Sequence, residues 1–336
     1  MEFLIDYGVF AAKLLTVAIV ISLGVGAFVL LILGRSHGSH EDHIKVKNLN
    51  DKYTSMTLAL KSAMLPAKLF KEALKEQKAD RKRQNREQKN DLKKSRVYVC
   101  RFVGDLHASA VPSLAEEVTA ILSVASADDE VVVIISSAGG VIQGYGLAAS
   151  QLQRIRDQGI RLTAAVDKVA ASGGYMMACV ADKIIAAPFA ILGSIGVVAQ
   201  LPNFNRLLKK HDIDYEEITA GEFKRTLTIF GENTDADRNK FREEIEDAHQ
   251  LFKEFVASNR PHVDMATIAT GEYWYGTRAL ERKLIDTLST SDDYLYRRSL
   301  ESDVFEVSYV RKRSIVDKIL GHTSKIFNML LVNAVK

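Results

Sequence analysis

Five consecutive β-branched aliphatic residues, Val131 to Ile135, constrain the fold of this chain most strongly. A run that is apolar on both faces is typical of a strand buried in a parallel sheet between layers of helix. Further strands are predicted at 97–103, 162–166, 183–186 and 190–198, with helices at 112–124, 144–157 and directly after residue 172. Strands and helices alternate at βα spacing. The pattern therefore predicts an α/β domain with a largely parallel sheet and functional loops at the carboxyl ends of its strands.

Two of the predicted strands lead into motifs of small residues. The first motif ends in Ser137-Ala138-Gly139-Gly140, where two glycines free backbone N–H groups to face a ligand. The second, Ala171-Ser172-Gly173-Gly174, joins strand 162–166 to a helix of small residues. A serine at such a turn suits a nucleophile, with the amide of Gly173 donating to a developing oxyanion. The same position also suits a serine that only caps the helix.

Two later motifs complete a recognisable set. They are Gly193-Ser194-Ile195-Gly196-Val197 and Gly221-Glu222-Phe223-Lys224-Arg225-Thr226. From about Val97 to Ser289, and in its N-terminal apolar segment, the chain resembles the signal peptide peptidase A family of membrane serine proteases, and within it the SohB branch. The resemblance implies a ClpP/crotonase-like spiral fold of ββα units. It also implies that Ser172 is the nucleophile, that Lys224 is the general base, and that Ser194 hydrogen-bonds the lysine amine.

A Ser-Lys dyad makes a specific demand on the lysine. A serine hydroxyl needs a base that is unprotonated near neutral pH, whereas a free lysine, with a pKa of about 10.4, is almost wholly charged there. Burial favours the neutral amine, so Lys224 must be desolvated to accept the proton of Ser172. Amides of Gly139 or Gly140 and of Gly173 would hold the oxyanion, and the lysine would then protonate the leaving amine and activate water.

Other chemistries are less well supported by the sequence. Residues 173–210 contain no histidine, which weighs against a Ser-His-Asp triad of the ClpP type. A non-proteolytic membrane scaffold or peptide-binding module, and acyl-CoA chemistry on a crotonase-type fold, remain alternatives that need neither Ser172 nor Lys224. The histidine-rich run at 37–43 lacks the spacing of a structural zinc site, and we expect no cofactor.

The N-terminus carries the strongest membrane signal. Leu14 to Gly34 is a 21-residue stretch without a charge, long enough to span a bilayer, and no small-residue cleavage site follows it. Four lysine or arginine residues lie within 35–52, against Lys13 alone before the span, which favours a cytoplasmic catalytic domain. The best-known relatives in the family face the periplasm instead. We expect one uncleaved span in the bacterial inner membrane.

The segment after the span is strongly basic. From Arg35 to Arg96 it carries 17 Lys and Arg against 8 Asp and Glu, so the rest of the chain has a net charge of about −6. Helical charge spacing in 65–94 predicts a solvated helical spacer, with contact to anionic lipid as an alternative. Nucleic-acid binding is not expected, because no aromatic residues interleave the basic cluster at 81–86.

These features divide the chain into four parts. We expect an anchor at 1–35, a basic helical linker at 36–95, a protease domain at 96–290, and a C-terminal strand with an amphipathic helix at 291–336. A long helix predicted at 235–258 has an apolar edge that needs a cover. Together with the family resemblance, this predicts a ring-like homo-oligomer that acts on peptide or protein substrates.

Overall fold

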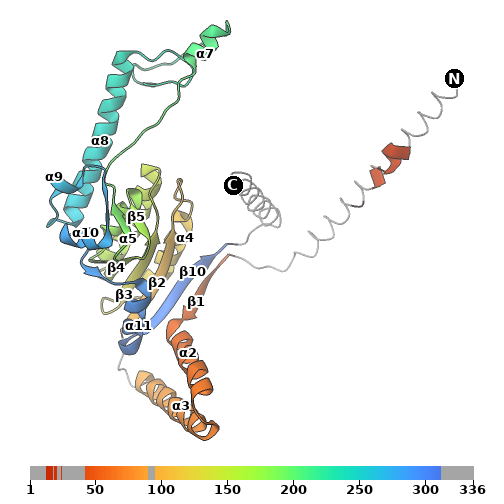
Figure 1. Cartoon of the computed structure of the whole chain (residues 1–336), viewed down its shortest axis with the longest axis vertical. Coiled ribbons are helices and arrows are strands. Elements are labelled where there is room, and N and C mark those ends of the chain that lie inside the picture. The colour runs from red at the N-terminus through yellow and green to blue at the C-terminus, as the bar shows by residue number, and fades with distance from the viewer. Residues whose placement is uncertain (1–12, 18, 21–23, 25–41, 90–94, 312–336) are drawn as a thin grey trace. The chain divides into compact units, whose positions relative to one another are not determined.

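The computed structural model of this chain describes residues 13–17, 19–20, 24, 42–89 and 95–311, with side chains omitted at 80–89 (Figure 1). Residues Ile44–Tyr309 form one compact unit. Across the described ranges no helix has both the length and the apolar character needed to cross a bilayer. Most of the apolar run from Leu14 to Gly34, most of the histidine-rich run and the helix predicted at 315–332 lie outside the described residues.

A seven-stranded sheet forms the centre of this unit. Its strands, in order across the sheet, are β1 (His43–Asn48), β10 (Asp303–Val310), β2 (Arg96–Val103), β3 (Glu130–Ser136), β4 (Arg161–Val166), β6 (Lys183–Ala186) and β9 (Thr287–Leu288). Neighbouring strands from β10 to β9 are all parallel. The run from Val131 to Ile135 is buried throughout, as the sequence predicted for the central strand β3.

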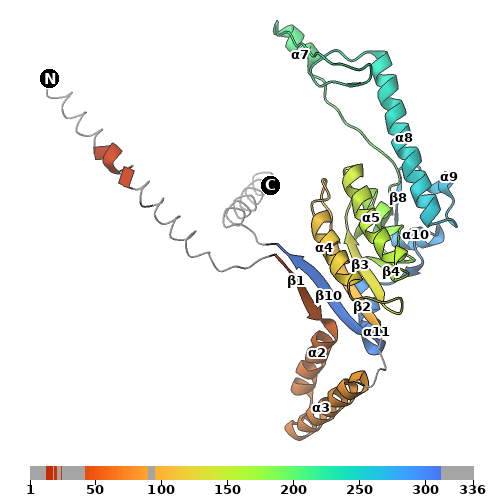
Figure 2. The same cartoon turned by 180° about the vertical axis from the view of Figure 1, so that it is seen from behind.

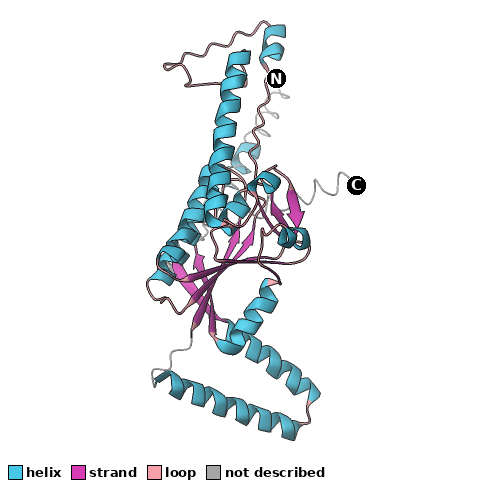
Figure 3. Cartoon of the chain, turned by 90° about the vertical axis from the view of Figure 1, so that its left-hand side faces the viewer, coloured by secondary structure: helices cyan, strands magenta, loops and turns pink. Residues whose placement is uncertain are grey.

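Helices cover both faces of the sheet, which explains why β3 is apolar on both sides (Figure 3). Val131, Val133 and Ile135 point into a core shared with α4 (Val111–Leu122), α5 (Ile142–Asp157), α6 (Gly173–Ala178) and α8 (Asp235–Asn259). Val132 and Ile134 face the opposite side, where α11 (Ser291–Glu301) and the start of α2 (Leu49–Met64) contribute Leu295 and Leu49. This layered α/β architecture agrees with the predicted fold class.

A second, three-stranded sheet carries the motif region. It contains β5 (Val169–Ala171), β7 (Ile191–Gly193) and β8 (Tyr273–Tyr275), with β5 parallel to β7 and β7 antiparallel to β8. The sequence did not predict β5, and it placed β7 within a longer strand at 190–198. Ser172 therefore follows β5 of the small sheet, whereas the sequence predicted that it follows strand 162–166 directly.

The N-terminal part of the unit is tied to its C-terminal end. β1 joins the large sheet beside β10, although the sequence placed the start of the domain near Arg96. At the start of α2, the Asn50 amide donates to the carbonyls of Ser299 (2.8 Å) and Ser302 (2.9 Å) and accepts from the Val304 N–H (2.8 Å). α3 (Ala67–Lys89) follows as the helix expected from the charge spacing.

Between β7 and α8 the chain forms an arm, residues 198–234, that contains α7 (Asn205–Lys210). The arm lies at the end of α8 away from the sheets (Figure 1; Figure 2 shows it from behind). α8 begins with a capping box, in which Thr234 and Asp237 exchange side-chain to backbone hydrogen bonds. The extended segment predicted at 215–219 forms no strand. Two short helices, α9 (Met265–Ile268) and α10 (Gly276–Glu281), complete the unit.

Candidate active site

Ser172 lies on a strained turn between β5 and α6. Its backbone has φ 50° and ψ −119°, a region that residues other than glycine rarely adopt. The Ser172 N–H donates to the carbonyl of Gly193 at 2.7 Å, which holds the turn on the small sheet. Its side chain makes no capping hydrogen bond to α6. The interpretation of Ser172 as a helix cap is therefore wrong, and its half-buried hydroxyl is available for another role.

The loop after β3 packs directly on this turn. Ser137 donates its N–H to the carbonyl of Val169 (2.9 Å) and accepts the Ala171 N–H on its own carbonyl (3.0 Å), so the loop is paired with β5. Gly139 has φ 92°, and a methyl group there would lie 2.7 Å from the Gly173 nitrogen and 2.8 Å from Cβ of Ser172. Only glycine allows the loop to approach the serine this closely.

The amides of this loop are not equivalent. The Gly139 N–H donates to Oγ of Ser137 at 3.1 Å, so it is already paired inside the loop. Within the part of the chain that the structure describes, no acceptor is recorded for the N–H groups of Gly140 and Gly173. Of the amides named from the sequence, these two are the ones free to stabilise an oxyanion beside Ser172.

Ser194 lies next to Ser172 at the end of the neighbouring strand. β5 and β7 are in parallel register with Ala171 opposite Gly193, so the two serines follow adjacent strands about 5 Å apart. Ser194 also has a positive φ, 53°, and its N–H donates to the carbonyl of Glu272 at 2.7 Å. The structure therefore brings Ser172, Ser194 and the glycine loop together.

Lys224 is placed differently. It lies on the arm, its side chain is exposed, and its N–H donates to the carbonyl of Gly221 at 3.2 Å. The neighbouring Phe223 contacts a different lysine, because the ammonium of Lys240 lies over its ring, 4.9 Å from the centroid. Among the described residues, no hydrogen bond is recorded between Lys224 and either serine. This single chain thus leaves the Lys224 side chain exposed to solvent.

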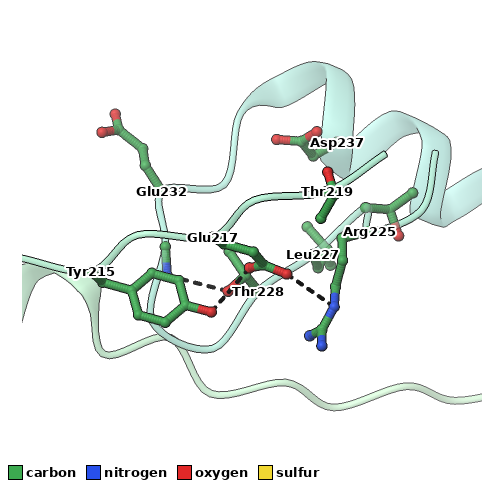
Figure 4. Close-up of a pocket in the computed structure, with 10 residues that line it drawn as sticks. Tyr215, Glu217, Thr219, Arg225, Leu227, Thr228, Glu232 and Asp237 are labelled. Atoms are coloured by element: carbon green, nitrogen blue, oxygen red, sulfur yellow. Dashed lines mark hydrogen bonds and ion pairs between the residues drawn. The ribbon is translucent and has the colours of Figure 1, made fainter. Parts of the chain in front are cut away.

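An open, polar pocket lies on the same arm, lined by Arg225 but not by Ser172 or Lys224 (Figure 4). Its volume is about 280 Å³. Glu217 accepts from both Nε of Arg225 and the hydroxyl of Tyr215, each at 3.0 Å. These side chains pair with one another within the arm. Because Ser172 does not line the pocket, the pocket is separate from the serine site.

One group at the site was not identified from the sequence. It is the phenol of Tyr145, which contacts Ser137 in the loop after β3. Tyr145 is fully buried in α5, and its hydroxyl lies 2.5 Å from Oγ of Ser137. Burial raises the pKa of the Tyr145 phenol above its ordinary value, so the hydroxyl keeps its proton and remains a donor. Tyr145 follows Gly140 by only five residues. On the predicted helix it is one apolar position among several, so the sequence does not indicate that its hydroxyl contacts the loop.

This α/β domain has a serine on a strained turn that packs against a glycine loop, with the N–H groups of Gly140 and Gly173 unpaired. Such an arrangement has the form of a nucleophilic hydrolase site. Comparison with known families agrees. Residues 154–304 match the model of peptidase family S49, and residues 2–152 match the model of the S49 N-terminal region. The chain therefore belongs to peptidase family S49 and is a peptidase.

Its relatives include proteins named probable protease SohB. That of Haemophilus influenzae is 46% identical, covering 94% of this chain and 92% of the relative. That of Buchnera aphidicola subsp. Schizaphis graminum is 43% identical, covering 100% and 98%. These matches confirm the resemblance to the signal peptide peptidase A family and its SohB branch. A solved structure, a mutant of the 1510-N membrane-bound stomatin-specific protease, matches with 14% identity and a TM-score of 0.41, covering 62% of this chain and 86% of that one. A similarity this low carries no further conclusion.

Proposed function

We propose that the protein is a membrane-anchored serine endopeptidase that cleaves peptides through an acyl-enzyme on Ser172. The observation that carries the proposal is the strained Ser172 turn beside two unpaired amides. Ser172 Oγ attacks the scissile carbonyl, and the N–H groups of Gly140 and Gly173 stabilise the oxyanion that forms. The amine leaves with a proton, and water then attacks the ester bond to release the acyl product and restore the serine.

Lys224 is the proposed general base, with Ser194 orienting its amine. The exposed position of Lys224 in a single chain means that something further must desolvate it. The arm offers a reason to expect a second copy of the chain in this role, because its apolar side chains are unusually exposed, with Val198 at 81% and Ile218 at 95%. We propose that a homo-oligomer covers the arm and brings a neutral lysine amine to the Ser172–Ser194 pair.

The remaining parts of the chain have proposed roles that follow the sequence. Residues 1–35 anchor the protein in the inner membrane by one span, with the catalytic domain on the cytoplasmic side. Residues 36–95 contain a basic helical linker that holds the domain off the membrane, with contact to anionic headgroups as the alternative. The protease domain predicted at 96–290 is extended by β1 before it and by α11 and β10 after it, which share its sheet and core. It forms a ClpP/crotonase-like spiral of ββα units, and the predicted amphipathic helix follows it. Substrates are signal-peptide remnants or misfolded membrane and envelope proteins.

Peptide cleavage by purified full-length protein in detergent tests this function. Ser172→Ala and Lys224→Ala should each abolish cleavage, because members of one catalytic unit do not contribute additively. Lys210→Ala is the matched control, since Lys210 is also an exposed lysine on the arm. Full activity in Lys224→Ala would remove the lysine from the mechanism. A folded wild-type protein that binds peptides without cleaving them would instead identify a peptide-binding scaffold.

A further inference from the structure

A series of hydrogen bonds runs from Tyr145 on α5 to the glycine loop beside Ser172. The Tyr145 hydroxyl donates to the carbonyl of Asp105 at 2.7 Å and lies 2.5 Å from Oγ of Ser137. The Gly139 N–H completes the series by donating to the same Oγ at 3.1 Å. Ser137 and Tyr145 are only 2% and 0% exposed, so water does not compete for the hydrogen bond between their hydroxyls, and the other two hydrogen bonds are partly buried.

The direction of each hydrogen bond in this series follows from the number of protons that each hydroxyl has. A tyrosine hydroxyl has one proton, and Tyr145 uses it on the Asp105 carbonyl, which can only accept. Ser137 must therefore donate its own proton to the Tyr145 oxygen, while its Oγ accepts from Gly139. Ser137 has no proton left for a substrate. A role for it in the reaction must be exerted through the position of the loop.

Tyr145 and Ser137 also pack tightly against the turn that carries Ser172. A methyl group at Gly173 would lie 2.4 Å from Cγ of Tyr145, and one at Gly174 would lie 2.5 Å from the carbonyl oxygen of Ser137. On the other side, a methyl group at Gly104 would come within 2.3 Å of both hydroxyl oxygens. Three glycines thus leave space for the Ser137–Tyr145 pair, and any shift of the pair is transmitted to the loop or to the turn.

We propose that Tyr145 and Ser137 are positioning residues, which hold the glycine loop so that the Gly140 amide faces the oxyanion formed at Ser172. Ala138, between Ser137 and Gly139, is exposed and makes no contribution of this kind. The loop instead takes its conformation from the Ser137 hydrogen bonds and from the positive φ of Gly139. This inference rests on the proposed function of Ser172 as the nucleophile.

The test uses the rate at which a fluorophosphonate labels Ser172, separated into a maximal rate kinact and an apparent binding constant KI. The phosphonyl oxygen occupies the oxyanion position, so kinact reports on that position. Tyr145→Phe leaves Ser137 without its acceptor, and we expect kinact to fall about 10- to 100-fold, with KI changed less than about twofold. Ser137→Ala, which removes the acceptor of Gly139, should give a similar fall, and the double variant should be no worse than either single one.

Tyr175→Phe is the matched control. Tyr175 is also a fully buried tyrosine, it lies on α6, and its hydroxyl donates to a main-chain carbonyl, that of Leu284, at 2.9 Å. It should lower the melting temperature about as much as Tyr145→Phe while leaving kinact within about twofold of wild type. Equal kinact in Tyr145→Phe and Tyr175→Phe would overturn the inference.

The outcomes separate this inference from the proposed function. If wild-type protein is not labelled at Ser172, the proposed function fails and the inference fails with it. If wild type is labelled and both Ser137→Ala and Tyr145→Phe retain its kinact, only the positioning role fails. Ser137→Ala removes a single oxygen, and it decides the question if Tyr145→Phe does not fold.

Discussion

Replacing Ser172 by glycine should make the protein more stable than replacing it by alanine, although both variants lack the proposed nucleophile. At φ 50° and ψ −119° any residue with a Cβ is strained, and such strain costs about 1–3 kcal/mol. Glycine removes this cost but makes the unfolded chain more flexible, which offsets about 0.4–1 kcal/mol. Because the serine side chain caps nothing, neither variant loses a capping hydrogen bond.

The expected net difference is about 1 kcal/mol in the free energy of unfolding in favour of Ser172→Gly. For a folded unit of this size, that corresponds to about 2–4 °C in melting temperature. The assay is urea or thermal unfolding of the two variants, side by side, by circular dichroism, under conditions where refolding is complete. Comparing two inactive variants removes any effect of self-cleavage on the result.

Ala178→Gly provides the control with the opposite sign. Ala178 is the last residue of helix α6 and is fully buried, so glycine there removes a buried methyl group at a cost of about 0.8 kcal/mol. Ala178→Gly should be less stable than wild type. If Ser172→Gly is likewise less stable than Ser172→Ala, then residue 172 is not strained in solution. The strained turn, and with it the reason for treating Ser172 as more than a loop residue, would be refuted.

Three further predictions concern other parts of the unit. Burial alone would raise the pKa of Asp286, but hydrogen bonds from Arg260 and a backbone amide outweigh it and hold the pKa below its ordinary value. The stabilisation is therefore present above about pH 4 and lost as the pH falls further, so Asp286→Asn should be destabilised at pH 7 and approach wild type below pH 4 in unfolding titrations. Asn50→Ala removes three hydrogen bonds and should cost about 1–3 kcal/mol, with faster hydrogen exchange at the start of α2; unchanged exchange there would contradict the docking of α2. Ile218→Asp should shift the protein toward monomer in light scattering, whereas an unchanged oligomer would exclude this residue from the interface.

The sequence predicted elements whose apolar pattern is long and unambiguous. The Val131–Ile135 run defined β3 because five consecutive apolar residues fit only a strand covered on both faces. α8 was predicted with nearly correct bounds because its charged and apolar residues repeat over many turns. By contrast, β5 has three residues and β7 has three, which is too short for an alternating pattern to appear.

The candidate site was predictable in part. The sequence named the small residues around Ser172 and the Gly139–Gly140 pair as groups that face a ligand, but it did not predict that the two motifs pack against each other, as they do in the structure. The hydrogen bond from Tyr145 to Asp105 was not predictable, because it joins residues 40 positions apart. The motif at 221–226 identified Lys224 as a candidate. Whether its amine is buried is not determined by the neighbouring sequence, because any residues that cover the arm lie outside this segment.

The most direct test of the central claim is mass spectrometry of the full-length protein after reaction with a fluorophosphonate at pH 8. We expect one phosphonyl group per reactive chain, on the peptide that contains Ser172, and no such adduct in Ser172→Ala. Lys224→Ala should remain folded and be labelled far more slowly than Lys210→Ala. An adduct on a different residue, or a folded and assembled wild-type protein that remains unlabelled, would contradict the assignment of Ser172 as the nucleophile.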